Sequence, residues 1–248
     1  MQSFRRGLRR SKSRQISSSK SDTLGSMKLR VVAAVMLTCM LGVSAAGARS
    51  HKKKETGSRS SAFDYYLLTL SYAPDFCSQP AGEKDPRECG QGRHVGFVVH
   101  GLWPQGERSR GPERCGSASP VAQDTVRAML NYLPTESLIQ HEWSTHGVCT
   151  GLSAGEYFGL IRRARDSVKI PDDLKAPARE LRLSTAEIAA KLAAANPSYP
   201  QGAFRVSCYR DGELQEVRIC LNKDLSPRVC GSSAGSCSAQ TLQIRPVR

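Results

Sequence analysis

Cysteine usage constrains the fold of this chain more than any other feature of its sequence. One of the nine cysteines, Cys39, lies in an apolar segment near the N-terminus, and the other eight follow it. An even number of cysteines in an exported chain is typical of a domain held by disulfides. No two of them have the Cys-x-x-Cys spacing of a structural zinc site. We therefore expect four disulfides, although cysteine spacing alone does not determine their pairing.

The N-terminal part of the sequence has the form of an export signal. Residues 27–48 begin with Met27 and two basic residues, continue with an apolar run over 31–43 and end in Ala-Gly-Ala, a signal-peptidase site. The apolar run is too short to span a membrane. Residues 1–26 are basic and rich in serine without apolar periodicity, so we expect them to be disordered. They are either an extended leader or sequence upstream of the true start at Met27.

Removal of residues 1–48 changes what the charge of the chain implies. The whole chain has 36 Lys and Arg against 22 Asp and Glu, a net charge of +14, but the expected mature chain keeps 27 against 21, a net of +6. That charge is compatible with a polyanionic substrate and does not by itself predict one. We expect a polar linker over 49–61 and a single domain over 62–248. The protein should be exported, to the periplasm or the medium, without stable membrane attachment.

Two short segments concentrate the chemistry of the chain. His141–Cys149 reads HEWSTHGVC and Phe97–Gln105 reads FVVHGLWPQ, so these segments hold three of the five histidines. The spacing of the apolar residues predicts a helix over Thr135–Thr145. On that helix Glu142 and His146 share a face and His141 lies one step round from Glu142, so the three can project into one broad cleft.

Three interpretations of these histidines compete. A zinc-protease helix needs histidines four residues apart, whereas His141 and His146 are one residue further apart and would point about 140° from each other. A second interpretation makes the histidines buried structural residues. The third is acid–base chemistry on RNA, because imidazoles titrate near neutral pH. One would take the proton of the attacking 2′-hydroxyl while another gives a proton to the departing 5′-oxygen.

The two segments together resemble the active-site segments of the ribonuclease T2 family, in their usual order. The resemblance extends to the strand-like segment Tyr66–Cys77 and to the C-terminal cysteines, and so covers about residues 62–245. It implies four disulfide pairs, namely Cys77 with Cys89, Cys115 with Cys149, Cys208 with Cys237, and Cys220 with Cys230.

The resemblance also implies roles for individual residues. His146 would be the base toward the 2′-hydroxyl and His100 the acid toward the leaving group. His141 would hold the phosphate, and Glu142 would stabilise the pentacoordinate phosphorus. Trp103 would belong to a base pocket, where an indole can stack on a base with little regard for its identity.

Two positions depart from the pattern of the family. Thr145 stands where the family often has a lysine, and loss of that cation would lower the rate unless another basic residue supplies the charge. Gln105 stands where many members have an aspartate that contacts the base. The change at Gln105, a candidate substrate-binding residue together with Trp103, leaves base preference open.

Outside these segments the sequence predicts a mixed domain. The strand signals and a hairpin at Asp211-Gly212 are separated by amphipathic helices without a repeated βαβ pattern, which indicates an α+β fold around a central antiparallel sheet with packed helices. The chain should turn away after a short strand over Gly96–His100. The other predicted strands are Phe63–Tyr72, Ala203–Tyr209 and Glu213–Asn222, and the other predicted helices are Val121–Leu133, Ala154–Ile170 and Thr185–Ala195.

We therefore expect an exported, monomeric endoribonuclease that needs neither a metal nor another cofactor. It should cleave single-stranded RNA through a 2′,3′-cyclic phosphate with low base specificity, and DNA should be inert because it lacks the 2′-hydroxyl. Two other classes remain open. Thr145 is compatible with a catalytically weak relative that acts as a secreted RNA-binding or toxin-like protein, which a turnover assay would separate. A metal-dependent hydrolase built on His141, Glu142 and His146 would be separated by a chelator.

Overall fold

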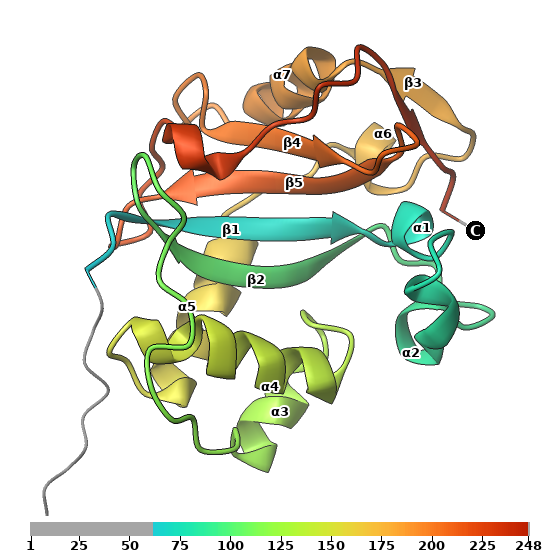
Figure 1. Cartoon of the computed structure of the whole chain (residues 1–248). Coiled ribbons are helices and arrows are strands. Elements are labelled where there is room, and N and C mark those ends of the chain that lie inside the picture. The colour runs from blue at the N-terminus through green and yellow to red at the C-terminus, as the bar shows by residue number, and fades with distance from the viewer. Residues whose placement is uncertain (1–61, 248) are drawn as a thin grey trace, which may run out of the picture. The chain divides into compact units, whose positions relative to one another are not determined.

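A four-stranded antiparallel sheet forms the centre of residues 62–247, the part of the chain that the computed structural model describes. Figure 1 shows the strands side by side. Their order across the sheet is β2 (Phe97–Gln105), β1 (Tyr65–Tyr72), β5 (Leu214–Leu221) and β4 (Phe204–Cys208). The hairpin predicted around Asp211-Gly212 is the β4–β5 pair. The predicted α+β class is confirmed.

Helices surround this sheet, and a second, two-stranded sheet lies near the C-terminus (Figure 1). α4 packs against β2, α5 against β1 and β2, and α7 against β4. The longer helices are α3 (Gln123–Met129), α4 (Glu136–Thr145), α5 (Ala154–Asp166) and α7 (Thr185–Ala195). The shorter elements are α1 (Ala73–Phe76), η1 (Gly82–Lys84), α2 (Pro86–Cys89), η2 (Gly147–Cys149), α6 (Asp172–Lys175), β3 (Leu181–Leu183), η3 (Ser232–Ala234) and β6 (Leu242–Ile244).

Side-chain caps explain where the main helices begin. The hydroxyl of Thr135 accepts a hydrogen bond from the backbone N–H of Leu138 at the start of α4. Capping boxes begin α5 and α7, the latter formed by Ser184 and Glu187. α3 and α5 end earlier than predicted, because the apolar pattern continues into turns that also pack in the core. Leu133 after α3 and Val168 after α5 are buried although neither is helical.

β2 is longer than the sequence predicted, and this is a correction. The chain does not turn away after His100, because Gly101 to Pro104 continue the strand and pair with β1. Pro104 misled the prediction, since it lacks the N–H that a central strand must donate. β2 lies at the edge of the sheet, where that missing donor costs no ladder bond.

The two faces of the sheet have different environments. In β1 the side chains of Tyr66, Leu68 and Leu70 belong to the large core that the helices cover. Tyr65 and Leu67 point to the opposite face and form a small cluster with Cys220, Cys230 and Ala234. This alternation is the period of two expected of a strand, and it shows that both faces of β1 are buried.

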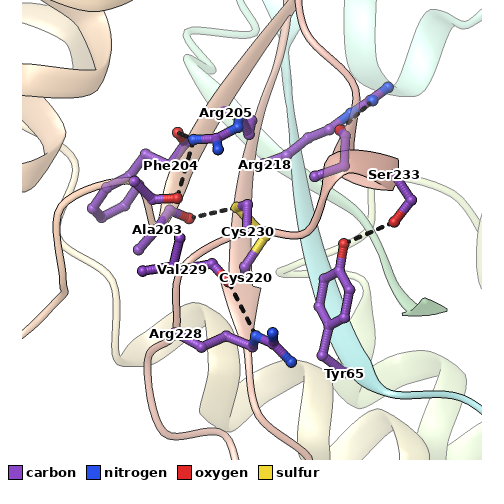
Figure 2. Close-up of a disulfide and its surroundings, with 12 residues drawn as sticks. Tyr65, Ala203, Phe204, Arg205, Arg218, Cys220, Arg228, Val229, Cys230 and Ser233 are labelled. Atoms are coloured by element: carbon purple, nitrogen blue, oxygen red, sulfur yellow. Dashed lines mark hydrogen bonds between the residues drawn. A yellow bond between two sulfur atoms is a disulfide. The ribbon is translucent and has the colours of Figure 1, made fainter. Parts of the chain in front are cut away.

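The four disulfides join the pairs that the family resemblance implies, namely Cys77–Cys89, Cys115–Cys149, Cys208–Cys237 and Cys220–Cys230. Figure 2 shows that the Cys220–Cys230 bond ties β5 to the segment that precedes η3. Within η3, Ser233 forms a 3.1 Å hydrogen bond with the hydroxyl of Tyr65 in β1. η3 and the segment before it are therefore fixed on the face of the sheet opposite the large core.

The predicted leader over 1–26, signal peptide over 27–48 and linker over 49–61 lie outside the described residues. Within residues 62–247 no helix is both long enough and apolar enough to cross a membrane.

Candidate active site

A bulge in β2 turns His100 toward the candidate site. The register of β1 and β2 shifts between Thr69 and Leu70, and His100 is the extra residue of β2 at this step. In a regular strand, residues three apart point to opposite faces. The extra residue places His100 on the same face as Trp103, and their ring centroids are 5.1 Å apart.

A carboxylate from β5 anchors His100. Nδ1 of His100 lies 2.7 Å from Oε1 of Glu216. The second oxygen of Glu216 accepts hydrogen bonds from Nε and Nη2 of Arg218, at 3.0 and 2.8 Å, and from the hydroxyl of Ser207 at 3.3 Å. The Glu216 side chain is only 3% exposed, so these bonds form away from water and satisfy a buried charge.

α4 contributes the second carboxyl group of the site. Glu142 is fully buried, and its Oε2 accepts a 2.9 Å hydrogen bond from the indole N–H of Trp103. Its Oε1 lies 3.9 Å from Nε2 of His100, which is too long for a hydrogen bond. This oxygen has no hydrogen-bond partner in the described part of the chain. Glu142 and His100 therefore face a common point without bonding to each other.

His146 lies directly after α4 and also contacts Trp103. The centroids of the Trp103 and His146 rings are 5.3 Å apart, with the planes tilted by 32°. His146 is 9% exposed, and its buried Nδ1 lacks a hydrogen-bond partner among residues 62–247. Trp103 thus contacts both imidazoles, one of which is anchored by a carboxylate and one of which is not.

Two hollows open on this cluster. The His146 hollow, about 280 Å³, is lined by His146, Trp103, Gln105, Arg110 and Arg218 among others. The His100 hollow, about 660 Å³, is lined by His100, His141, Glu88 and Glu216 among others. The structure therefore brings the predicted site residues together around Trp103, with His141 and His146 on different hollows rather than in one cleft.

A structural zinc site would need His141 and His146 within a cluster of metal ligands. Among residues 62–247 there is no group of three or more His, Cys, Asp or Glu side chains arranged to hold a metal.

The environments of the two imidazoles move their pKa values in opposite directions. Burial lowers the pKa of His146 to about 4, and the positive charges of His141, His100 and Arg114 add to the effect. Burial also acts to lower the pKa of His100, but the hydrogen bond and charge of Glu216 outweigh it and raise that pKa above its usual value. At mildly acidic pH one ring is neutral and the other is protonated. A general base and a general acid need these two states.

The carboxyl groups nearby are also perturbed. Burial raises the pKa of Glu142 to about 7, against the opposing effects of His100 and of the hydrogen bond from Trp103. Burial, with the charge of Asp85, raises the pKa of Glu88 in α2 to about 7. At mildly acidic pH Glu142 is therefore a neutral acid whose Oε1 can donate a hydrogen bond to a third group.

The sequence prediction missed Glu216 and Arg218. Their signal was present, because they lie two residues apart and therefore on one face of the mostly apolar strand LQEVRICL. A carboxylate and a guanidinium on one face of a buried strand need a partner to offset their burial. That partner, His100, is 116 residues away in the sequence, so no local pattern identifies it.

Arg114 is a second missed residue, and it bears on the departure at Thr145. The Thr145 side chain is buried, and its carbonyl accepts a 2.7 Å hydrogen bond from the N–H of Arg114. Arg114 has a left-handed backbone with φ of 52°, beside the disulfide-bonded Cys115. Its charge is close enough to lower the pKa of His146. The structure thus places a cation near the position where the family often has a lysine.

Together the fold and the site define a class, a disulfide-linked α+β protein with a candidate histidine site around a half-buried tryptophan. The model of the Ribonuclease T2 family matches residues 63–230. The chain belongs to this family of ribonucleases.

The similar proteins agree with this assignment. The chain is 31% identical over 181 residues to a probable ribonuclease of Haemophilus influenzae, an alignment that covers 68% of this chain and 61% of that protein. It is 32% identical over 180 residues to a ribonuclease of Aeromonas hydrophila, covering 71% and 77%. The solved structure of an RNase-related protein from Calystegia sepium matches with a TM-score of 0.61 at 20% identity, over 76% of this chain and all of that one. At that identity the structural match supports the fold.

Proposed function

We propose that the protein is an endoribonuclease that cleaves single-stranded RNA by attack of the 2′-hydroxyl on the adjacent phosphorus. The observation that carries the proposal is the pair of imidazoles around Trp103, one with a lowered pKa and one with a raised pKa. Family membership and the ribonuclease relatives support it. None of the proposed steps requires a metal or another cofactor.

In the first step neutral His146 takes the proton of the 2′-hydroxyl while the 2′-oxygen attacks phosphorus. Nε2 of protonated His100 gives a proton to the 5′-oxygen as the bond between phosphorus and that oxygen breaks. The products are a 2′,3′-cyclic phosphate and a free 5′-hydroxyl. Protonated Glu142 donates a hydrogen bond to a non-bridging oxygen, where charge accumulates in the transition state. His141, exposed on the His100 hollow, holds the phosphate.

In the second step the two imidazoles exchange roles. His100, now neutral, takes a proton from water as the water oxygen attacks the cyclic phosphate. His146 returns its proton to the 2′-oxygen, and a 3′-phosphate results.

Base preference should be weak. Trp103 lines the His146 hollow, and an indole stacks on any base. Gln105 lines the same hollow and already accepts a 3.2 Å hydrogen bond from the N–H of Gly111 through its Oε1. Position 105 lacks the aspartate with which many relatives contact the base, and Glu113 is the carboxylate that lines this hollow instead.

We further propose export to the periplasm or the medium and a monomeric state. The disulfides support export, because they persist in oxidising compartments. The form of residues 27–48 supports it as well. Mass spectrometry of the protein recovered outside the cytoplasm should give an N-terminus at Arg49, and sedimentation should give one chain per particle.

The test of the reaction uses residues 49–248 with intact disulfides and a dinucleoside phosphate in excess EDTA. The pH profile of kcat/KM should be bell-shaped, because His146 must be neutral and His100 protonated. Its acidic limb should lie near pH 4, and its alkaline limb should reflect loss of the protons of both His100, whose pKa is raised, and Glu142, whose pKa is about 7. His100→Ala and His146→Ala should each lose about 10³-fold in kcat. His94→Ala, an exposed histidine outside both hollows, is the matched control.

The outcomes of this assay distinguish the proposed ribonuclease from the other classes of protein. A 2′,3′-cyclic phosphate that disappears in both site variants supports the proposal. Folded protein that yields no product between about pH 4 and 8 would mean a catalytically weak binding or toxin-like relative. Activity that EDTA abolishes, or cleavage of single-stranded DNA at a comparable rate, would contradict the proposed mechanism.

A further inference from the structure

We propose that Glu216, supported by Arg218, is the positioning residue that fixes the imidazole of His100 for proton donation. The inference rests on the proposed function, in which His100 is the general acid. Glu216 does not touch the reacting atoms in this scheme. It holds one nitrogen of the ring, and the other nitrogen then faces the phosphate.

The hydrogen bond between His100 and Glu216 determines which nitrogen is available. A carboxylate at 2.7 Å accepts the Nδ1 proton, and this selects the orientation and tautomer of the ring. Nε2 then points toward Oε1 of Glu142, 3.9 Å away, which is the common point of the site. After Nε2 gives its proton to the leaving oxygen, the Nδ1–H of the neutral ring still donates its hydrogen bond to Glu216. The ring therefore keeps its place for the second step.

The register of the sheet explains how the two side chains meet. His100 is in β2 and Glu216 is in β5, with β1 between them. β1 places Ser71 opposite Glu216 and Thr69 opposite Arg218. These side chains are small, so they leave room for His100 and Glu216 to meet above β1. The bulge at His100 lies at the same step of the sheet and gives the ring its direction.

Arg218 is fixed in turn by η3. Its Nη1 donates a 2.9 Å hydrogen bond to the carbonyl of Ala234 in η3, and its guanidinium lies 5.9 Å from the centre of the Trp103 ring. Figure 2 shows Arg218 beside the Cys220–Cys230 disulfide and Ser233, which tie this region to β5 and β1. Arg218 lines the His146 hollow while Glu216 lines the His100 hollow, so the pair connects the two halves of the site.

Several elements present charged or titratable groups to His100. They are Glu216 and Arg218 from β5, Glu142 from α4, Glu88 from α2, and His146 after α4. Among these described groups Glu216 is the one within hydrogen-bond distance of the ring. Burial opposes the ionisation of Glu216, but His100 and Arg218 outweigh it and lower its pKa. Its negative charge is therefore present throughout the pH range in which the acid must hold a proton.

The first experiment compares Glu216→Gln with wild type in residues 49–248. Loss of the carboxylate charge should lower the pKa of His100 by about one unit or more, and the alkaline limb of kcat/KM should move down with it. At pH 6 kcat should fall about 10- to 100-fold while KM changes less than about 3-fold, because the residue does not bind the substrate. Glu216→Asp, which keeps the charge, should retain a higher alkaline limb than Glu216→Gln. Glu136→Gln removes an exposed carboxylate from the start of α4 and is the matched control.

An NMR titration of the His100 ring keeps the test independent of activity. The resonance is assigned by its loss in His100→Ala, and its pKa is measured in folded Glu216→Gln. If that variant does not fold, Arg218→Gln is titrated instead, since loss of the guanidinium weakens the same anchor. An unchanged His100 pKa in the folded variant would overturn the inference.

A change of leaving group separates positioning from general damage. A nucleoside 3′-(p-nitrophenyl phosphate) expels a stable phenolate and needs little help from a general acid. Glu216→Gln should therefore lie within about 3-fold of wild type on this substrate while losing activity on the dinucleoside phosphate. An equal loss on both substrates would mean a merely structural role. If His100→Ala remained active on the dinucleoside phosphate, the proposed function itself would fail, so the two failures are distinguishable.

Discussion

At the scale of single residues, Gly101 shows how closely the backbone of β2 approaches the side chains of the candidate site. A Cβ at this position would overlap the Glu142 carboxylate and the Trp103 indole nitrogen, the two groups that share a hydrogen bond. Gly101→Ala must push them apart, and displacements of about 1 Å in such a site can cost about 100-fold in rate. We expect a loss of at least about that size in kcat/KM for a dinucleoside phosphate.

The matched control for Gly101→Ala is Gly116→Ala. A Cβ at Gly116 meets no atom within 4 Å, so activity should be unchanged. Gly101→Ala with activity within about 3-fold of wild type, in a protein of unchanged thermal stability, would show that the site tolerates the displacement and that the contact is not needed.

Single residues also show what the sequence could and could not predict. The two histidine segments were predictable from the sequence because their chemistry is concentrated in a few positions. The direction of His100 was not, because the bulge depends on how β2 pairs with β1 rather than on a local pattern. The contact of Glu216 with His100 was not predictable for a similar reason, since it joins strands that are far apart in the chain.

At the scale of elements, the Cys115–Cys149 disulfide joins the long loop before α3 to η2, which follows α4 with only His146 between them. It holds Arg114 near His146, whereas neither cysteine of the Cys208–Cys237 bond, which secures β4, lines either hollow. The two bonds close loops of similar length, with sequence separations of 34 and 29 residues. Chain entropy therefore assigns each about 4 kcal/mol of stability.

Removing each disulfide by a pair of Cys→Ser substitutions should separate stability from activity. Both variants should lose similar thermal stability, but only loss of Cys115–Cys149 should reduce kcat/KM by about 10-fold or more below the melting transition. The measurements are thermal unfolding and turnover at 20 °C. Equal activity losses in the two variants would mean that the Cys115–Cys149 bond has no specific effect on the site.

Element boundaries were predictable where capping residues mark them and not where packing does. α7 begins and ends where its capping box and Asn196-Pro197 predict. β3 and β6 have three residues each, too few for a periodic pattern, and they form because they pair with each other. The C-terminal half of β2 was missed because the position of Pro104 at a sheet edge is a property of the assembled sheet.

At the scale of the whole molecule, buried carboxyl groups make stability depend on pH in an unusual direction. Burial raises the pKa values of Asp75, Glu88 and Glu142 to about 7 each. In the unfolded chain these groups lose their protons near pH 4. The folded state therefore holds protons that the unfolded state has lost, and each group reduces the free energy of unfolding by about 1.4 kcal/mol per pH unit between about pH 4.5 and 7.

His146 opposes this trend, since its folded pKa of about 4 lies below its unfolded value. Its contribution to stability grows as the pH rises from about 4 to 6.5, which offsets one of the three carboxyl groups. Between acid and neutral pH, these four groups together bind about two more protons in the folded state than in the unfolded state. The free energy of unfolding therefore falls as the pH rises. We therefore expect a higher urea midpoint at pH 5 than at pH 7 for residues 49–248 with intact disulfides.

Glu88→Gln tests the cause of this dependence. Glu88 is buried, with one oxygen that lacks a hydrogen-bond partner in the described chain, so the neutral amide removes a titrating group at little cost in shape. The difference in unfolding free energy between pH 5 and 7 should shrink by about one proton's contribution, while Glu136→Gln should leave it unchanged. A higher midpoint at pH 7 in the wild type would contradict the direction of the trend. If the difference in unfolding free energy between pH 5 and 7 is unaltered in Glu88→Gln, other groups produce the pH dependence. A molecule with this dependence is most stable in the pH range where His100 is protonated and His146 is neutral, so one pattern of burial would favour both the fold and the reaction in mild acid.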